Sequence, residues 1–178
     1  MSDDTNYRRN VTMVLKALMG RLTADPPSTV VEVGVIPHRF RETYGASVGG
    51  SCAERIWAEM GFSVNRWDMA DKDTIDDAVI GWDICEGPPP GRYDLCVVSE
   101  VLEHVADPFA AVTQLKGAAP VVLVTVPFLY PEHEPKPDLW RFTPDGLAEL
   151  LRQGGFSEVE TEVAYVDGRI TNVGAVAR

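Results

Sequence analysis

Residues 92–142 read RYDLCVVSEVLEHVADPFAAVTQLKGAAPVVLVTVPFLYPEHEPKPDLWRF and contain two short apolar runs, each followed by polar residues. The first run ends at Ser99-Glu100 and continues into the turn-like segment 101–105. The second ends at 127–128 and continues into a polar, aromatic loop. Apolar, β-branched runs of this length are typical of buried strands, and the segment between them has a helical pattern. Because α/β sheets bind ligands beyond the carboxyl ends of their strands, both polar segments are candidates for a binding site.

The rest of the chain continues this alternation of strand and helix. The expected helices cover residues 11–22, 51–60, 71–78, 108–115 and 144–153, and Asp107 and Thr143 are placed to cap the last two. The expected strands cover 29–35, 62–67, 79–84, 93–99, 120–126, 156–163 and 169–177. This pattern predicts an α/β, doubly wound, mostly parallel sheet of about seven strands. The last two strands have no helix between them, so one strand at the C-terminal end should run antiparallel.

Length and charge restrict the organisation and the partners. The 178 residues are expected to form a single domain (1–178), with an N-terminal helix within 1–24 and a substrate-side loop over 127–142. The net charge of −11 argues against a broad nucleic-acid footprint, which needs clustered Lys and Arg. No apolar run is long enough to span a bilayer and no signal-peptide pattern is present. We therefore expect no nucleic-acid and no membrane partner, and the cytoplasm as the default location.

Cysteine and histidine usage gives no indication of a metal site. The three cysteines are scattered and lack the spacing of metal ligands. The three histidines, His38, His104 and His133, are also far apart in sequence, so we expect no metal. A cluster of His133 with Glu134 and Asp138 is the alternative.

Acidic residues fall near the ends of successive predicted strands. Glu32 lies in the first, Asp68 follows the second, and Asp83 follows the third. A carboxylate just beyond a strand can accept charge-assisted hydrogen bonds from ribose hydroxyls or an adenine amino group. Taken singly, each fits an ordinary polar residue at a strand end better than a ligand-binding group; the order of all three is more informative.

With these residues in order, the chain resembles the class I S-adenosylmethionine-dependent methyltransferases over Val30–Val163, most strongly in SEVLEHVADP and PFLYPEHEPKPDLWRFTPDGLAELLRQGGF. The resemblance implies a Rossmann-like fold, S-adenosylmethionine as cofactor and a small-molecule acceptor. It also implies roles for matching positions. Glu32 and Gly34 would receive the methionine end, Asp68 the ribose, Asp83 and Ile84 the adenine, while Ser99 and Glu100 would lie beside the sulfonium and the acceptor.

One departure from the family pattern follows Gly34. The family motif continues as G-x-G, whereas this chain reads Val33-Gly34-Val35-Ile36-Pro37-His38. A second glycine would let the backbone approach the cofactor closely. Its absence also argues against a nicotinamide dinucleotide, which needs the full glycine-rich turn. It favours an alternative function, a non-catalytic methyltransferase-like scaffold or regulatory subunit.

The remaining candidates lie around the histidines. Histidine is the natural base near neutral pH, so His133 and His104 are candidates for the catalytic base or for substrate contact, with loop ordering or capping as the alternatives. His38 could face the cofactor. Tyr130, Asp138, Trp140 and Arg141 are candidates for substrate binding, Arg141 through an anionic group. Alternatively, Trp140 anchors the loop and Arg141 pairs with Asp138.

These observations lead to one main hypothesis and two alternatives. The main hypothesis is methyl transfer from S-adenosylmethionine to a small molecule. The alternatives are the non-catalytic protein of the same fold and a nucleic-acid methyltransferase, which the acidic charge opposes.

Overall fold

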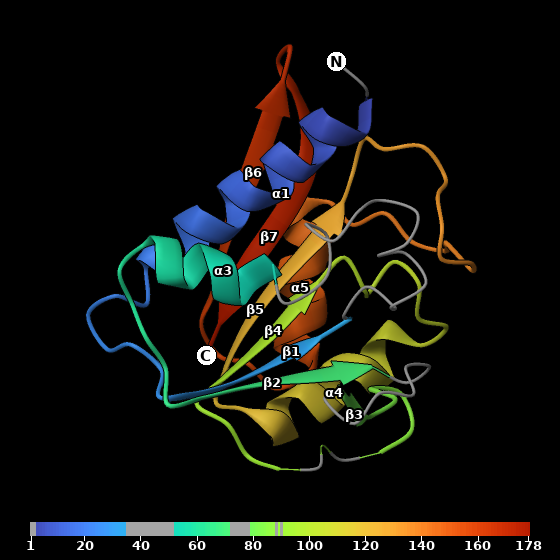
Figure 1. Ribbon diagram of the computed structural model, residues 1–178. Coiled ribbons are helices and arrows are strands. Elements are labelled where there is room, and N and C mark those ends of the chain that lie inside the picture. The colour runs from blue at the N-terminus through green and yellow to red at the C-terminus, as the bar shows by residue number, and fades with distance from the viewer. Residues whose placement is uncertain (1–2, 35–51, 72–78, 88, 90) are drawn as a thin grey trace.

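The computed structural model describes residues 3–34, 52–71, 79–87, 89 and 91–178. The helices are α1 (Asp3–Gly20), α3 (Cys52–Glu59), α4 (Pro108–Ala118) and α5 (Pro144–Gln153). The strands are β1 (Thr29–Val33), β2 (Arg66–Asp71), β3 (Val79–Gly81), β4 (Leu95–Ser99), β5 (Val121–Pro127), β6 (Val159–Val166) and β7 (Arg169–Ala177). They form one seven-stranded sheet in the order β3-β2-β1-β4-β5-β7-β6, shown in Figure 1.

The pairing confirms the expected α/β sheet. Strands β3, β2, β1, β4 and β5 are mutually parallel, and β7 is antiparallel to both β5 and β6. The chain order reverses between β1 and β4, which are direct neighbours although β2 and β3 lie between them in sequence. The carboxyl ends of β1 and β4 at this reversal are where open α/β sheets bind ligands.

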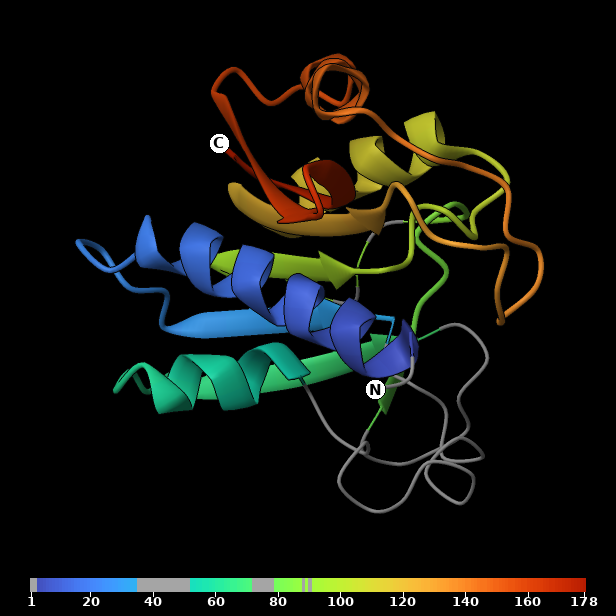
Figure 2. The same cartoon turned by 90° about the horizontal axis from the view of Figure 1, so that it is seen from above.

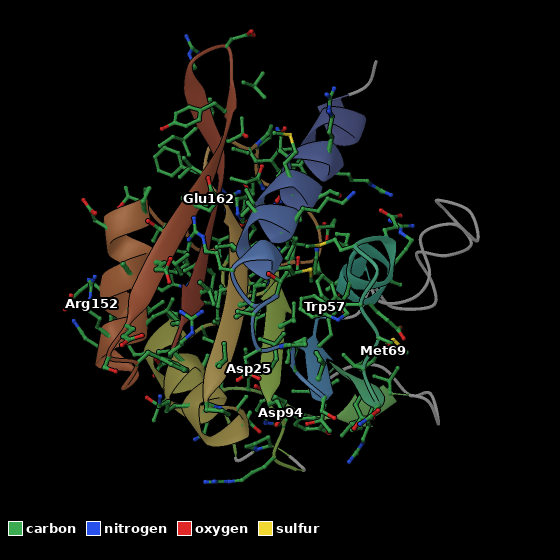
Figure 3. All side chains as sticks on the ribbon, turned by 90° about the vertical axis from the view of Figure 1, so that its left-hand side faces the viewer. Asp25, Trp57, Met69, Asp94, Arg152 and Glu162 are labelled. Carbon is green, nitrogen blue, oxygen red and sulfur yellow. The ribbon has the colours of Figure 1, made fainter. Side chains whose placement is uncertain are left out.

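Helices cover both faces of the sheet, as Figures 1 and 2 show. Helices α1 and α3 cover one face, where Leu15, Leu18 and Trp57 are buried in one apolar cluster with side chains of the central strands. Helices α4 and α5 cover the other face, where Leu115 and Leu151 belong to a second cluster. Figure 3 shows side chains filling both layers. Burial on both faces explains why the central strands are apolar throughout.

The helix caps formed as the sequence predicted. Asp107 accepts hydrogen bonds from the backbone N–H groups of Phe109 and Ala110 at the start of α4. Thr143 accepts one from Gly146 at the start of α5. Both helices have proline at their first position, where no intrahelical N–H bond is lost.

The expected bounds of β2, β3, β6 and α1 were wrong, and β6 covers Val159–Val166 instead of 156–163. Strand β2 covers Arg66–Asp71 instead of 62–67, because Phe62 stays with α3 and donates its N–H to the Trp57 carbonyl. Asp68 therefore lies inside β2, and Asp71 is its last residue. Strand β3 ends at Gly81 and not at residue 84. Helix α1 begins at Asp3, well before residue 11. The helix expected over 71–78 begins at a strand residue and otherwise lies outside the described residues.

No helix among the described residues combines the length and apolar character needed to cross a bilayer.

Candidate functional site

The turns after β1 and β4 pack closely against each other. Gly34, directly after β1, has φ +85° and donates its N–H to the Ala70 carbonyl of β2. A Cβ atom on Gly34 would lie 2.0 Å from Cγ2 of Val101, just beyond β4. Only glycine suits this conformation and this contact. Gly34 therefore holds the two central strand ends together.

Glu100 begins the turn after β4 in a left-handed conformation, with φ +56°. Its Oε2 atom accepts a hydrogen bond from the Tyr7 hydroxyl of α1, and its Oε1 atom is buried without a hydrogen-bond partner among the described residues. The Tyr7 ring stacks on Tyr130 of the loop after β5, at 3.8 Å between centroids. The N-terminal helix and this loop thus meet beside Glu100.

Glu103 lies deeper, with its side chain fully buried. Its backbone carbonyl accepts hydrogen bonds from the N–H groups of Leu139 (2.7 Å) and Trp140 (3.2 Å), which fixes the loop over it. Neither carboxylate oxygen has a hydrogen-bond partner in the described part of the chain. Buried carboxylates normally have partners, so the Glu103 carboxylate is a candidate ligand-binding group.

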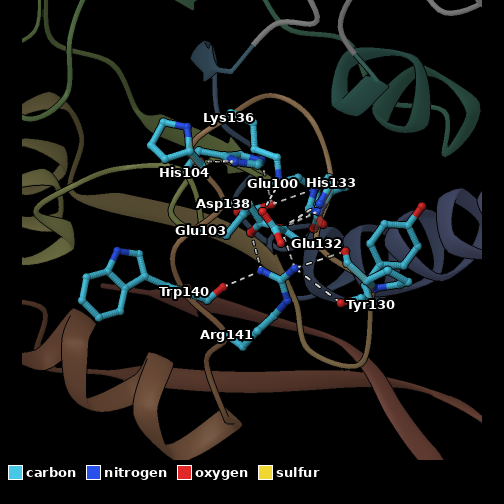
Figure 4. A network of polar contacts seen from close by, with 12 residues as sticks. Glu100, Glu103, His104, Tyr130, Glu132, His133, Lys136, Asp138, Trp140 and Arg141 are labelled. Carbon is cyan, nitrogen blue, oxygen red and sulfur yellow. Dashed lines mark hydrogen bonds and ion pairs between the residues drawn. The ribbon is translucent and has the colours of Figure 1, made fainter.

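Two histidines face the Glu103 carboxylate. The Nε2 atoms of His104 and His133 lie 3.6 and 3.9 Å from Glu103 Oε1. His104 Nδ1 is 2.9 Å from the Pro137 carbonyl oxygen. His133 donates its backbone N–H to Asp138 Oδ2 at 2.9 Å, and its Nδ1 atom lies 3.1 Å from the same oxygen without hydrogen-bond geometry. Figure 4 shows these side chains gathered with Glu100.

Arg141 and Asp138 form a two-bond ion pair behind His133. The Arg141 Nη1 and Nη2 atoms lie 2.5 and 2.7 Å from the two Asp138 oxygens, and they also donate to the carbonyls of Trp140, Tyr130 and Pro131. The Arg141 hydrogen bond, with the His133 N–H bond, holds the pKa of Asp138 well below its usual range. Asp138 is therefore ionised and positions His133.

Burial shifts the pKa values of the groups inside the cluster. It raises the pKa of Glu100 to about 8, against the opposing effects of Thr125 and Arg141. Burial and the charge of Glu100 raise the pKa of Glu103 well above its usual value. Burial also lowers the pKa of His104. The cluster therefore resists negative charge on its acids and positive charge on His104, unless a cation is bound there.

The loop residues predicted for substrate binding are largely occupied by the loop itself. Trp140 donates its indole N–H to the Val105 carbonyl at 2.8 Å, although 40% of the residue is exposed. Arg141 pairs with Asp138, as the anchoring alternative proposed. Tyr130 is the member of this set that stacks on Tyr7 and contacts His133 edge-on, at 5.2 Å between ring centroids.

The residues predicted for the cofactor are spread along the neighbouring strand ends. Glu32 is buried in β1 and accepts a hydrogen bond from the Ala53 N–H of α3. Ser99 ends β4, and its hydroxyl is 2.9 Å from that of Thr125. Asp83 follows β3 and accepts from the Cys85 N–H at 2.8 Å, while Ile84 is buried in the apolar core.

Asp68 is displaced from the position that the sequence suggested. It pairs in register with Val31, two residues before the end of β1. Its carboxylate accepts hydrogen bonds from the Tyr93 hydroxyl (2.6 Å) and lies 2.5 Å from Arg66 Nη2. Burial alone would raise the pKa of Asp68, but the hydrogen bonds from Arg66 and Tyr93 and the charge of Arg66 together outweigh it, so that the pKa is lowered. Burial and the hydrogen bond to Asp68 raise the pKa of Tyr93 to about 12.

Sequence reasoning did not single out Tyr7, Glu103 or Asp71 as candidates. Asp71 is level with Gly34, since the preceding residues Ala70 and Val33 pair in register. Two signals were available: Glu103 directly precedes the histidine of the LEH turn, and an aspartate stands three residues after Asp68. The second motif residue, Val35, and the residues Ile36, Pro37 and His38 lie outside the described part of the chain.

No family model and no curated protein matched the sequence. Solved structures match over nearly the whole chain. A methyltransferase in complex with the Trm112 methyltransferase activator of Haloferax volcanii is 16% identical, with a TM-score of 0.62 over 98% of this chain and 91% of its own. The chain has a class I methyltransferase fold.

Two further matches carry cofactor or product. The trans-methyltransferase CalH, in complex with S-adenosylhomocysteine, is 16% identical with a TM-score of 0.63, over 95% of this chain and 55% of its own. Magnesium protoporphyrin IX methyltransferase from Synechocystis PCC 6803, with bound S-adenosylmethionine, is 14% identical with a TM-score of 0.59, over 94% and 79%. The resemblance found in the sequence therefore extends to the whole architecture.

Proposed function

We propose that this protein transfers a methyl group from S-adenosylmethionine to a small-molecule acceptor. The observation that carries the proposal is the position of the buried Glu100 and Glu103 carboxylates. They follow β4 at the strand reversal of a methyltransferase fold, and three of their four oxygens lack a hydrogen-bond partner among the described residues. Site groups kept unsatisfied inside a protein are typical of ligand-binding positions.

The strand ends suit the charge of the cofactor. S-adenosylmethionine is a sulfonium, and when bound it supplies an electrophilic methyl group. The Glu100 carboxylate, with Oε1 unpartnered in the described structure, would stabilise that positive charge. The turn at Gly34, Asp71 at the end of β2, and Asp83 with Ile84 after β3 would hold the rest of the cofactor. Asp71 replaces Asp68 in this proposal.

The acceptor would bind against the histidines. Tyr7 and Tyr130 stack beside them, so α1 and the loop after β5 would exclude water and restrict the space to a small molecule. The Glu103–His104–His133 cluster would then hold the nucleophilic atom and accept or displace its proton. Asp138 and Arg141 position His133 for this task.

Calorimetry with S-adenosylmethionine and S-adenosylhomocysteine tests the cofactor step, followed by a screen for methyl transfer to small hydroxyl, amine and thiol compounds. We expect both cofactor forms to bind. We also expect His133→Asn to lower turnover by about 100-fold or more with cofactor affinity unchanged. Glu132→Gln, which changes an exposed carboxylate paired with Lys136 in the same loop, is the matched control.

Failure of both cofactor forms to bind at millimolar concentration would reject the proposal and favour the non-catalytic alternative. If the cofactor binds and His133→Asn retains full turnover, the acceptor step does not take place at this cluster.

A further inference from the structure

Glu103, His104 and His133 bring three potential metal-ligand atoms together. One carboxylate oxygen and two imidazole nitrogens all lie within 4.8 Å of one another. The Glu103 Oε1 atom is 3.6 and 3.9 Å from the two Nε2 atoms. Ligands bound at about 2.0–2.2 Å from one divalent ion are themselves roughly 3–4 Å apart. The three atoms therefore need little movement to share an ion.

The partners of the two rings determine which nitrogen is available. His104 Nδ1 faces the Pro137 carbonyl oxygen, which can only accept a hydrogen bond. His133 Nδ1 faces the Asp138 carboxylate, which Arg141 keeps ionised. The Pro137 carbonyl therefore holds the proton of His104 on Nδ1, and the nearby charge of Asp138 favours the same tautomer of His133, which leaves Nε2 of each ring for a ligand. Metal-binding histidines are oriented in the same way, by a carboxylate or a carbonyl on the second nitrogen.

The cluster consequently contains acceptors without a donor. Both oxygens of the fully buried Glu103 lack a hydrogen-bond partner among the described residues. A proton on Glu103 would not satisfy the site, because the distances of 3.6 and 3.9 Å to the imidazole nitrogens exceed a hydrogen bond. Arg141 is the nearby cation, and it is already paired with Asp138. A bound cation resolves this arrangement.

We propose that Glu103, His104 and His133 bind one divalent transition-metal ion, of the Zn²⁺ type. Two imidazoles and one carboxylate favour such an ion over Mg²⁺ or Ca²⁺, which prefer oxygen ligands. Three protein ligands leave part of the coordination shell open, as in catalytic sites. An oxygen atom of the acceptor would take the open position. This last step rests on the proposed function, whereas the ion site does not.

The sequence suggested no metal because the histidines are separated by 29 or more positions in the chain. The fold removes that separation for His104 and His133, whose ring centroids are 5.0 Å apart. The ligands differ from the alternative cluster of His133, Glu134 and Asp138, since Asp138 instead supports His133 from behind.

The test uses the full chain without an affinity tag, stripped with a chelator and dialysed. Titration with Co²⁺, followed by its visible absorption, and with Zn²⁺, followed by calorimetry, should each show one ion per chain. We expect Glu103→Gln and His133→Gln each to weaken binding by about 100-fold or more, and Asp138→Asn by about 10–100-fold. Glu132→Gln should bind like the wild type. Circular dichroism confirms that each variant is folded.

The absence of saturable ion binding by the wild type would overturn the proposal. Unchanged ion affinity in His133→Gln would also overturn it. This variant changes a loop residue and should fold even if Glu103→Gln does not. Cofactor calorimetry on the stripped protein separates the two ideas. Cofactor binding without ion binding is compatible with methyl transfer and rejects the ion site. Ion binding without cofactor binding supports the site and rejects methyl transfer.

Discussion

The two halves of the carboxyl edge of the sheet treat their acidic residues in opposite ways. At β1 and β2, Glu32 accepts from the N–H of Ala53 and Asp68 accepts from Tyr93. At β4, the Glu100 and Glu103 carboxylates are buried, and among the described residues three of their four oxygens have no hydrogen-bond partner, while the fourth accepts from Tyr7. In the first half, Glu32 and Asp68 use their carboxylates for hydrogen bonds within the protein. The second half keeps them available, at a cost in stability.

This difference shows which kind of evidence locates a site. An acidic residue in a strand is as compatible with a structural hydrogen bond as with a ligand, and the partners in the fold decide between them. Buried acceptors without donors cannot contribute to folding, because burying a polar group without a hydrogen bond is unfavourable. Glu103 is therefore a stronger functional candidate than Asp68.

The largest expected effect is a loss of stability at the contact between the turns after β1 and β4. Gly34→Ala should lower the free energy of unfolding by about 3 kcal/mol, because the new methyl group overlaps Val101 in a backbone conformation that disfavours alanine. Gly61→Ala is the matched control: Gly61 has φ +86°, with no atom within 4 Å of the added Cβ, so it should cost only about 1 kcal/mol. Urea unfolding without cofactor measures both. Equal losses would contradict the close packing of β1 against β4.

The next effect is a pH-dependent change in stability caused by Glu100, after β4. Burial raises the pKa of Glu100 from its ordinary value of 4.5 to about 8. A raised pKa gives stability that is complete below the unfolded-state value and is lost as pH rises through the folded-state value. Over this window, Glu100→Gln should therefore become more stable relative to the wild type, by about 1–2 kcal/mol between pH 5 and pH 8. Urea unfolding of chelator-treated protein at several pH values measures this.

Comparison with the variant is necessary because other groups titrate in the same window. The lowered pKa of His104 makes stability rise with pH, while the raised pKa of Glu103 makes it fall. Both groups remain in Glu100→Gln, so the difference between the two curves reports Glu100 together with its effect on the pKa of Glu103. Parallel curves from pH 5 to pH 8 would show that the Glu100 carboxyl is solvated.

The sequence predicted the layers of the fold because the signals for them are local. The apolar runs of β1, β4 and β5 and the caps at Asp107 and Thr143 each lie within a few neighbouring residues. The register of β2 was not predictable in this way. Phe62 suits a strand equally well, and its contact with Trp57 of α3 decides that the strand starts later.

The cluster needed the tertiary structure. Tyr7 reaches Glu100 across 93 positions of the chain, and His104 contacts Pro137 across 33. Glu103 is buried because the backbone of Leu139 and Trp140 closes over its carbonyl. Periodicity contains no information on such contacts. The basicity of histidine identified His104 and His133 as candidates but did not indicate that they face one carboxylate.

The smallest expected effect distinguishes the roles of Asp71 and Asp68, two acidic residues of β2. Asp71 ends β2, whereas Asp68 lies three residues earlier, roughly 10 Å away at about 3.3 Å per residue. Asp71→Asn should weaken S-adenosylmethionine binding by about 10-fold, because Asp71 is the last residue of β2, at the sheet edge where the proposed cofactor lies. Asp68→Asn should leave that affinity unchanged and lower the free energy of unfolding by about 1 kcal/mol, because it weakens the contacts with Tyr93 and Arg66. Calorimetry and urea unfolding on both variants give the comparison. If Asp68→Asn alone weakens S-adenosylmethionine binding, the cofactor contacts a residue inside β2. The distinction between structural carboxylates at β1 and β2 and ligand-binding carboxylates at β4 would then be wrong.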